Sequence, residues 1–246
     1  MKVFSVVGIT QSGKTTTIEN IIKELRGRGY SVGSVKEIHF EEFAIDTEGT
    51  NTFRHKEAGS QLVTARGNYE TDMLFQEKLH IDRLLSFYDH DFVVLEGVTD
   101  ANVPKIISAH NEKEIMERLD DLVFAVSGRI SNKIDEFNGL PVINSILNIE
   151  ALVDLIEEKV YDRLPSFPKE CCSECGYSCR ELGVRILKGE AKREDCILNN
   201  SKIELQIDGK HIDMVPFVQD ILYNTVLGVV KELKGYEKDK EIIIKI

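Results

Sequence analysis

The residues best suited to chemistry lie in a short loop near the start of the chain. Gly8–Thr15, GITQSGKT, matches the pattern G-x-x-x-x-G-K-[ST] at every required position. In such a loop the backbone N–H groups surround a phosphate, the Lys14 ammonium reaches the β- and γ-phosphates, and the Thr15 hydroxyl can ligate Mg²⁺. An apolar segment enters the loop and an amphipathic segment leaves it, as this motif requires. We therefore predict a nucleotide site contacted by Gly8, Thr10, Gln11, Ser12, Gly13, Lys14, Thr15 and Thr16.

A carboxylate is expected beside such a loop, because it holds the metal ion or one of its waters. Glu96 directly follows the apolar run Phe92–Leu95 and precedes Gly97. Ligands bind at the carboxyl edge of open α/β sheets, and a strand ending at Glu96 would deliver its side chain there. We predict that Lys14 and Glu96 form the catalytic pair and that Thr15 and Glu96 hold the magnesium ion.

A second short pattern bears on the base of the nucleotide. Asn132-Lys133-Ile134-Asp135 spells N-K-x-D, in which the Asp reads guanine in regulatory GTPases and the Lys packs along the ring. In those proteins the motif follows its strand directly, whereas Ser127–Ser131 intervenes here. Two interpretations stay open: a displaced loop in which Asn132, Lys133 and Asp135 read the base, or the start of an unrelated helix.

All five cysteines lie between Cys171 and Cys196. Such crowding indicates metal binding rather than a disulfide framework. The spacing C-x2-C-x3-C-x16-C, with a following L-x-x-x-I-L-x-G pattern, resembles the small four-cysteine [4Fe–4S] domain of corrinoid iron–sulfur proteins, although that domain has one more residue between its second and third cysteines. Four thiolates suit a [4Fe–4S] cluster or Zn²⁺, and both remain open. The predicted ligands are Cys172, Cys175, Cys179 and Cys196.

The elements that must position these groups alternate between short strands and helices. This rhythm predicts an α/β P-loop NTPase fold with a mostly parallel sheet flanked by helices, followed by a small cysteine-rich α+β domain. We expect domains at 1–161 and 171–246, joined by a linker at 162–170. The predicted strands are Val3–Val7, Ser31–Lys36, Phe92–Leu95, Lys105–Ser108, Leu122–Val126, Lys202–Ile207 and Ile242–Ile246, and the predicted helices are Thr15–Leu25, Ala151–Lys159 and Phe217–Leu233.

Composition excludes several classes of protein. A formal net charge of −11 over 246 residues argues against a general nucleic-acid binder or a binder of anionic membranes. No apolar run approaches the roughly 20 residues needed to span a bilayer. MKVFSVVGIT runs straight into a predicted strand, so we expect no signal peptide and predict a cytoplasmic protein.

Further residues, taken with the P-loop, follow the order seen in one family. These residues are VKEIHF at the end of the second predicted strand, then Asp46, Gly49 and Arg54, and then VVLEGV and VPKI. Their order resembles the MobB family, the GTP-binding adaptor of molybdopterin-guanine dinucleotide biosynthesis. The resemblance covers most of residues 1–160. It implies GTP and Mg²⁺ as cofactors, Asp46 near the metal ion, and a homodimer. From the residues alone, Asp46 could equally cap a turn.

Two departures from the family leave room for a different client. The family has Lys-His where this chain has Lys36-Glu37, and a Lys is missing within Gly49–Thr52. The function we predict is a slow GTPase adaptor for maturation of a molybdenum or tungsten cofactor, working beside a molybdopterin nucleotidyltransferase or a client metalloenzyme. The alternative is a nucleotide-gated carrier of a metal or an iron–sulfur cluster.

Overall fold

The computed structural model describes residues 1–40, 43–166, 175–196, 203, 205–207, 210–211, 214, 216–237 and 242. The chain divides into two compact units, Met1–Arg163 and Leu164–Ile246. The boundary falls inside the segment predicted as a linker. Among the described residues, no helix is both long enough and apolar enough to cross a bilayer.

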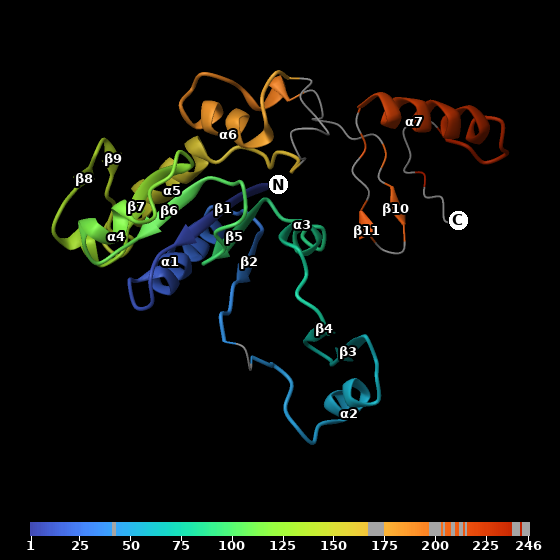
Figure 1. Ribbon diagram of the computed structural model, residues 1–246, viewed down its shortest axis with the longest axis horizontal. Helices are drawn as coiled ribbons and strands as arrows, with labels where there is room; N and C mark the ends of the chain where they lie inside the picture. Colours follow the sequence, from blue (N-terminus) through green and yellow to red (C-terminus); the bar gives the residue numbers. More distant parts are fainter. Residues whose placement is uncertain are drawn as a thin grey trace. The chain divides into compact units, whose positions relative to one another are not determined.

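The first unit is built on a parallel sheet of five strands in the order β2-β5-β1-β6-β7 (Figure 1). The neighbours of β1 are β5 and β6, which come much later in the chain, so β1 is central. This arrangement confirms the predicted α/β fold. The strands are β1 (Lys2–Val7), β2 (Val32–Lys36), β5 (Phe92–Glu96), β6 (Lys105–Ser108) and β7 (Val123–Ser127).

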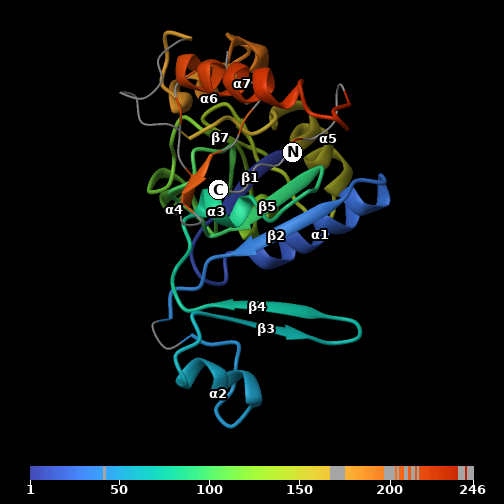
Figure 2. The same ribbon diagram turned by 90° about the vertical axis from the view of Figure 1, so that its right-hand side faces the viewer.

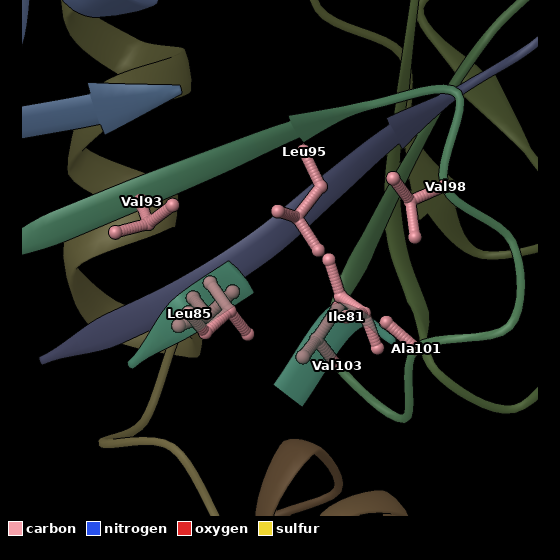
Figure 3. Close-up of a cluster of buried hydrophobic side chains, with 8 residues drawn as sticks. Ile81, Leu85, Val93, Leu95, Val98, Ala101 and Val103 are labelled. Atoms are coloured by element: carbon pink, nitrogen blue, oxygen red, sulfur yellow. The ribbon is translucent and has the colours of Figure 1, made fainter. Parts of the chain in front are cut away.

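Helices cover both faces of this sheet because its strands are apolar on both sides. On one face, Ile81 and Leu85 of α3 (Ile81–Leu85) pack with Val93 and Leu95 of β5, as Figure 3 shows. On the same face, α4 (Glu112–Met116) packs its buried Ile115 against residues of β6 and β7. Helix α3 was not among the predicted elements.

The opposite face carries two longer helices, α1 (Lys14–Gly27) and α5 (Ile149–Lys159), which pack against each other. Phe4 and Val6 alternate along β1 with the residues that face α3 and α4, so they point to this second face. Both are buried, as are the apolar residues that α1 and α5 contribute. The buried residues of the two helices are Ile18, Ile21, Leu25, Leu152, Val153 and Ile156.

An excursion between β2 and β5 was not predicted from the sequence. It contains α2 (Asn51–Glu57) and an antiparallel hairpin of β3 (Leu62–Arg66) and β4 (Thr71–Phe75). The hairpin and α2 pack on each other, and Figures 1 and 2 both draw them apart from the five-stranded sheet. The turn residue Tyr69 is fully exposed.

Shorter elements complete the description. After β7 come η1 (Arg129–Asn132) and a small hairpin of β8 (Glu136–Phe137) and β9 (Leu140–Pro141). The second unit contains α6 (Cys179–Leu187), η2 (Arg193–Asp195), the antiparallel pair β10 (Gln206–Ile207) and β11 (Lys210–His211), and α7 (Pro216–Val230). Nearly all of the predicted strand Ile242–Ile246 lies outside the described residues.

Candidate nucleotide and metal site

The P-loop leaves the carboxyl end of β1 and turns directly into α1. Its path needs left-handed backbone at Gly13, whose φ is 108°, and at Gln11, whose φ is 62°. Gly13 caps α1 with no side-chain hydrogen bond. The first amides of a helix have no partner within the helix, and here they follow the loop, so the arrangement suits an anion.

The loop is held from behind by residues of two other strands. Ser12 is fully buried and its hydroxyl donates to Ser108 Oγ at 3.2 Å. Ser108 Oγ in turn donates to the Ser12 carbonyl at 3.1 Å, and the backbone N–H of Arg129 donates to the same carbonyl at 3.1 Å. One ring nitrogen of His110, Nε2, lies 2.9 Å from the Gln11 carbonyl. These hydrogen bonds fix the shape of the loop.

The ammonium of Lys14 folds back onto the loop and donates to the Ile9 carbonyl at 2.5 Å. Burial lowers the pKa of Lys14 below its ordinary value of 10.5, Glu96 raises it, and the nearby Lys36 ammonium lowers it further. A phosphate in the loop would give this charge its missing counter-ion.

Glu96, the last residue of β5, meets the P-loop. Thr15 Oγ1 donates to Glu96 Oε1 at 2.9 Å, and Lys36 Nζ lies 3.0 Å from the same oxygen. Parallel pairing places Lys36 of β2 opposite Glu96, and the glutamate side chain is only 13% exposed. The hydroxyl and carboxylate oxygens suit Mg²⁺, which takes one or two protein ligands and completes its shell with phosphate and water.

A cavity of about 350 Å³ adjoins the P-loop. The cavity extends from the P-loop to η1 and to the segment before α5. The residues that line it are Gln11, Gly13, Lys14, Thr15, Thr16, Thr17, Gly128, Arg129, Asn132, Asn144, Ser145 and Ile146.

The N-K-x-D residues are only partly brought to this cavity. Asn132 lines it, whereas Lys133 and Asp135 are not among the described residues that do. The Lys133 N–H instead donates to the Ile130 carbonyl, and the Asp135 carbonyl, just before β8, accepts from the N–H of Val142, just after β9. Base reading by Lys133 and Asp135 stays a prediction.

Asp46 lies just before α2 and holds the hydroxyl of Thr50, the N-cap residue of that helix. Its Oδ1 accepts from Thr50 Oγ1 at 2.7 Å, from Thr52 Oγ1 at 3.0 Å and from the Thr47 N–H at 2.9 Å. The hydrogen bond from Thr50 is the main reason that the pKa of Asp46 is lowered. These contacts match the capping alternative raised from the sequence, and the predicted place near magnesium stays a prediction.

The cysteine site is described only in part. Cys172 and Cys171 lie outside the described residues, Cys175 Sγ donates to the Tyr177 carbonyl at 3.5 Å, and Cys179 begins α6. Within the described residues, no three His, Cys, Asp or Glu side chains are grouped so that they could hold a metal ion. The cluster, the zinc alternative and the carrier function built on them stay predictions.

Several residues outside the motifs shape the site and were not predicted from the sequence. Ser108 and Gly128 support the P-loop from behind, and Lys36 pairs with Glu96. Asn144 lines the cavity and donates to Asn132 Oδ1 at 2.9 Å. The available signal was position, because Lys36 and Ser108 each end a predicted strand and Gly128 lies two residues beyond the end of another.

Comparisons with known proteins identify the family of this chain. The family model described as MobB, molybdopterin guanine dinucleotide synthesis protein B, matches residues 3–128, just over half of the chain. A Methanocaldococcus jannaschii protein is 31% identical over 253 aligned residues, covering 100% of this chain and 97% of its own length. Its name assigns it, provisionally, as a molybdopterin-guanine dinucleotide biosynthesis adapter protein.

Bacterial relatives match a smaller share of the chain. The Haemophilus influenzae molybdopterin-guanine dinucleotide biosynthesis adapter protein is 29% identical, covering 62% of this chain and 85% of its own length. The crystal structure of Bacillus subtilis MobB superimposes with a TM-score of 0.56 at 24% identity, covering 66% of this chain and 100% of that one, which supports the fold. On the family match and the full-length relative together, this chain belongs to the MobB family.

Proposed function

We propose that this protein binds GTP with Mg²⁺ in the P-loop cavity, hydrolyses it slowly, and serves as an adapter in molybdopterin-guanine dinucleotide biosynthesis. One observation carries the proposal: the Thr15 hydroxyl, 2.9 Å from the Glu96 carboxylate, lies beside the partly buried Lys14 in a preformed P-loop. The choice of pathway rests on the names of the relatives.

The chemistry assigned to the chain's own residues is positioning and charge neutralisation. The loop amides and Lys14 would hold the β- and γ-phosphates, and Thr15 and Glu96 would hold the magnesium ion, which supplies charge neutralisation when bound. Glu96 would then exchange its bond with Thr15 for one with the metal. Lys36 remains beside Glu96 as a second cation near the phosphates.

Slow turnover is expected because the described site offers few groups that act only in the transition state. Among the described residues lining the cavity, Arg129 is the one arginine, and it is exposed. A partner could therefore supply the missing charge, as arginine fingers do in other P-loop proteins. We propose a molybdopterin nucleotidyltransferase or a client molybdenum or tungsten enzyme as this partner, and a homodimer as the working form. The cytoplasmic location remains a prediction.

The test is calorimetric titration of the full chain with GTP in the presence of Mg²⁺. Lys14→Ala should weaken binding by about 10- to 100-fold, because it removes charge-assisted hydrogen bonds to phosphate. Lys23→Ala removes the same charge from an exposed position of the same helix and should leave affinity unchanged. Equal affinity in wild type and Lys14→Ala would refute the phosphate site.

Glu96→Gln separates catalysis from binding. The amide keeps the size of the side chain and loses its charge, so Mg²⁺-dependent hydrolysis should fall by about 100-fold or more. Nucleotide affinity measured without Mg²⁺ should change little. A variant with unchanged Mg²⁺-dependent turnover would remove Glu96 from the metal site.

A further inference from the structure

The cavity beside the P-loop has a rigid wall formed by the segment before α5. Ser145 is buried, and its hydroxyl lies 3.1 Å from the hydroxyl of Thr17 in α1. Asn20 of α1 also donates to the Ser145 carbonyl at 3.1 Å. Because α1 begins at the P-loop itself, these contacts fix the wall relative to the place where phosphates would bind.

Two asparagines on this wall have side-chain orientations set by the backbone. Asn144 Oδ1 accepts from the N–H groups of Ile146 at 2.9 Å and Leu147 at 3.1 Å. Its amide nitrogen must then point the other way, and it donates to Asn132 Oδ1 at 2.9 Å. The amide nitrogen of Asn132 donates in turn to the Arg129 carbonyl at 3.2 Å.

This chain of hydrogen bonds determines what the wall can offer a ligand. A side-chain amide has two N–H donors, and in the described contacts Asn144 and Asn132 each use one. Each therefore retains one N–H, while both Oδ1 atoms already accept hydrogen bonds. Both asparagines line the cavity, as do the exposed side chains of Ile146 and Arg129.

We propose that Asn132 and Asn144 form a donor pair that selects the base of the nucleotide through its 6-oxo group and N7. The inference rests on the proposed nucleotide site. Guanine and hypoxanthine present acceptors at O6 and N7, whereas adenine presents an amino donor at position 6. Two N–H donors therefore favour guanine and hypoxanthine. With adenine, one donor would face the amino group and stay unpaired, which weakens binding. Ile146 and Arg129 supply apolar and cationic surface for the ring.

This assignment differs from guanine reading by an N-K-x-D aspartate. Such an aspartate accepts from the ring N–H and the 2-amino group, so it discriminates at position 2. The donor pair reads position 6 and ignores the 2-amino group. Inosine triphosphate, which lacks that amino group, therefore separates the two mechanisms.

The experiment is competition of GTP, ITP, XTP and ATP against a fluorescent guanine nucleotide on the full wild-type chain with Mg²⁺. The donor pair predicts that ITP binds within about threefold of GTP and that ATP binds about tenfold or more weakly. ITP weaker than GTP by about tenfold, or ATP equal to GTP, would overturn the inference while leaving the nucleotide site intact. Failure of every triphosphate to bind would instead overturn the proposed function.

Two variants complete the test. Asn144→Asp keeps the oxygen that accepts from Ile146 and Leu147 but removes the donor, so the preference for GTP over ATP should fall about tenfold. Asp135→Asn should leave the order of GTP and XTP as in wild type, because Asp135 does not line the cavity. A switch of this variant from GTP to XTP would assign base reading to Asp135 and refute the donor pair.

Discussion

Gly128 offers the sharpest test of how the P-loop is supported. It follows β7 with φ 84° and ψ −156°, a combination that is essentially restricted to glycine. A Cβ added there would lie 2.5 Å from Ser108 Oγ, 2.6 Å from the Ser12 carbonyl oxygen and 2.9 Å from the Ala109 nitrogen. Two of these three neighbours are backbone atoms, and one belongs to the P-loop, so the clash cannot be relieved by turning a side chain.

Gly139 provides a matched control. It has a similar φ of 80° in the β8–β9 turn, but a Cβ added there meets nothing within 4 Å. Gly139→Ala therefore measures the cost of left-handed backbone alone, about 1–2 kcal/mol. Gly128→Ala adds overpacking of about 1–3 kcal/mol, which gives a total loss of about 2–5 kcal/mol in the free energy of unfolding.

The two variants should also differ in nucleotide binding. Because the Cβ of Gly128→Ala presses on the Ser12 carbonyl, it should displace the loop and weaken GTP binding, whereas Gly139→Ala should bind as wild type. Urea unfolding and calorimetric titration measure the two effects. Equal losses of stability in both variants, with unchanged GTP affinity in Gly128→Ala, would refute the reasoning.

Three further predictions concern charge and metal. Because burial lowers the pKa of Lys14 below its ordinary value of 10.5, its ammonium loses its proton at a lower pH than an exposed lysine does. GTP affinity should therefore begin to decline before the pH reaches 10.5, and constant affinity up to that pH would contradict the assignment. The Arg28 guanidinium lies 2.9 Å from Glu24, 2.6 Å from Asp154 and 2.5 Å from Glu157, and so joins α1 to α5. Arg28→Ala should therefore lower the melting temperature by about 2–4 °C and leave GTP affinity unchanged. An unchanged melting temperature would show that these ion pairs add no stability. Protein purified without oxygen should contain about four irons and four sulfides per chain if the predicted cluster forms, one zinc if the alternative is right, and neither metal if both are wrong.

Much of the site could be predicted because its signals are local. The P-loop pattern fixes residue types over eight consecutive positions, and the apolar run before Glu96 needed only the rule that ligands bind at the carboxyl edge of a parallel sheet. The structure brings Thr15 and Glu96 within hydrogen-bond distance, as that rule implies. The strands β1, β5 and β6 were predicted to within one residue at each end for the same reason, since each is a short buried apolar run.

Helix α2 and the β3–β4 hairpin could not be predicted from local sequence patterns. Helix α2 has no buried residue, and most side chains of the hairpin are exposed. Neither segment therefore shows the regular spacing of apolar residues by which helices and strands are recognised in a sequence. Their existence depends on packing against each other. The capping of α2 by Thr50, whose hydroxyl donates to Asp46, became evident only with the backbone in view.

The sequence by itself determined that this chain has a P-loop, an acidic residue to accompany it and an α/β sheet to hold both, because these properties are encoded in adjacent residues. Tertiary structure decided which distant residues complete the site. Lys36, Ser108, Gly128 and Asn144 reach it from four separate segments, and their approach depends on the strand order β2-β5-β1-β6-β7 and on the pairing register. No local pattern specifies that order, since it results from how the whole sheet buries its two apolar faces.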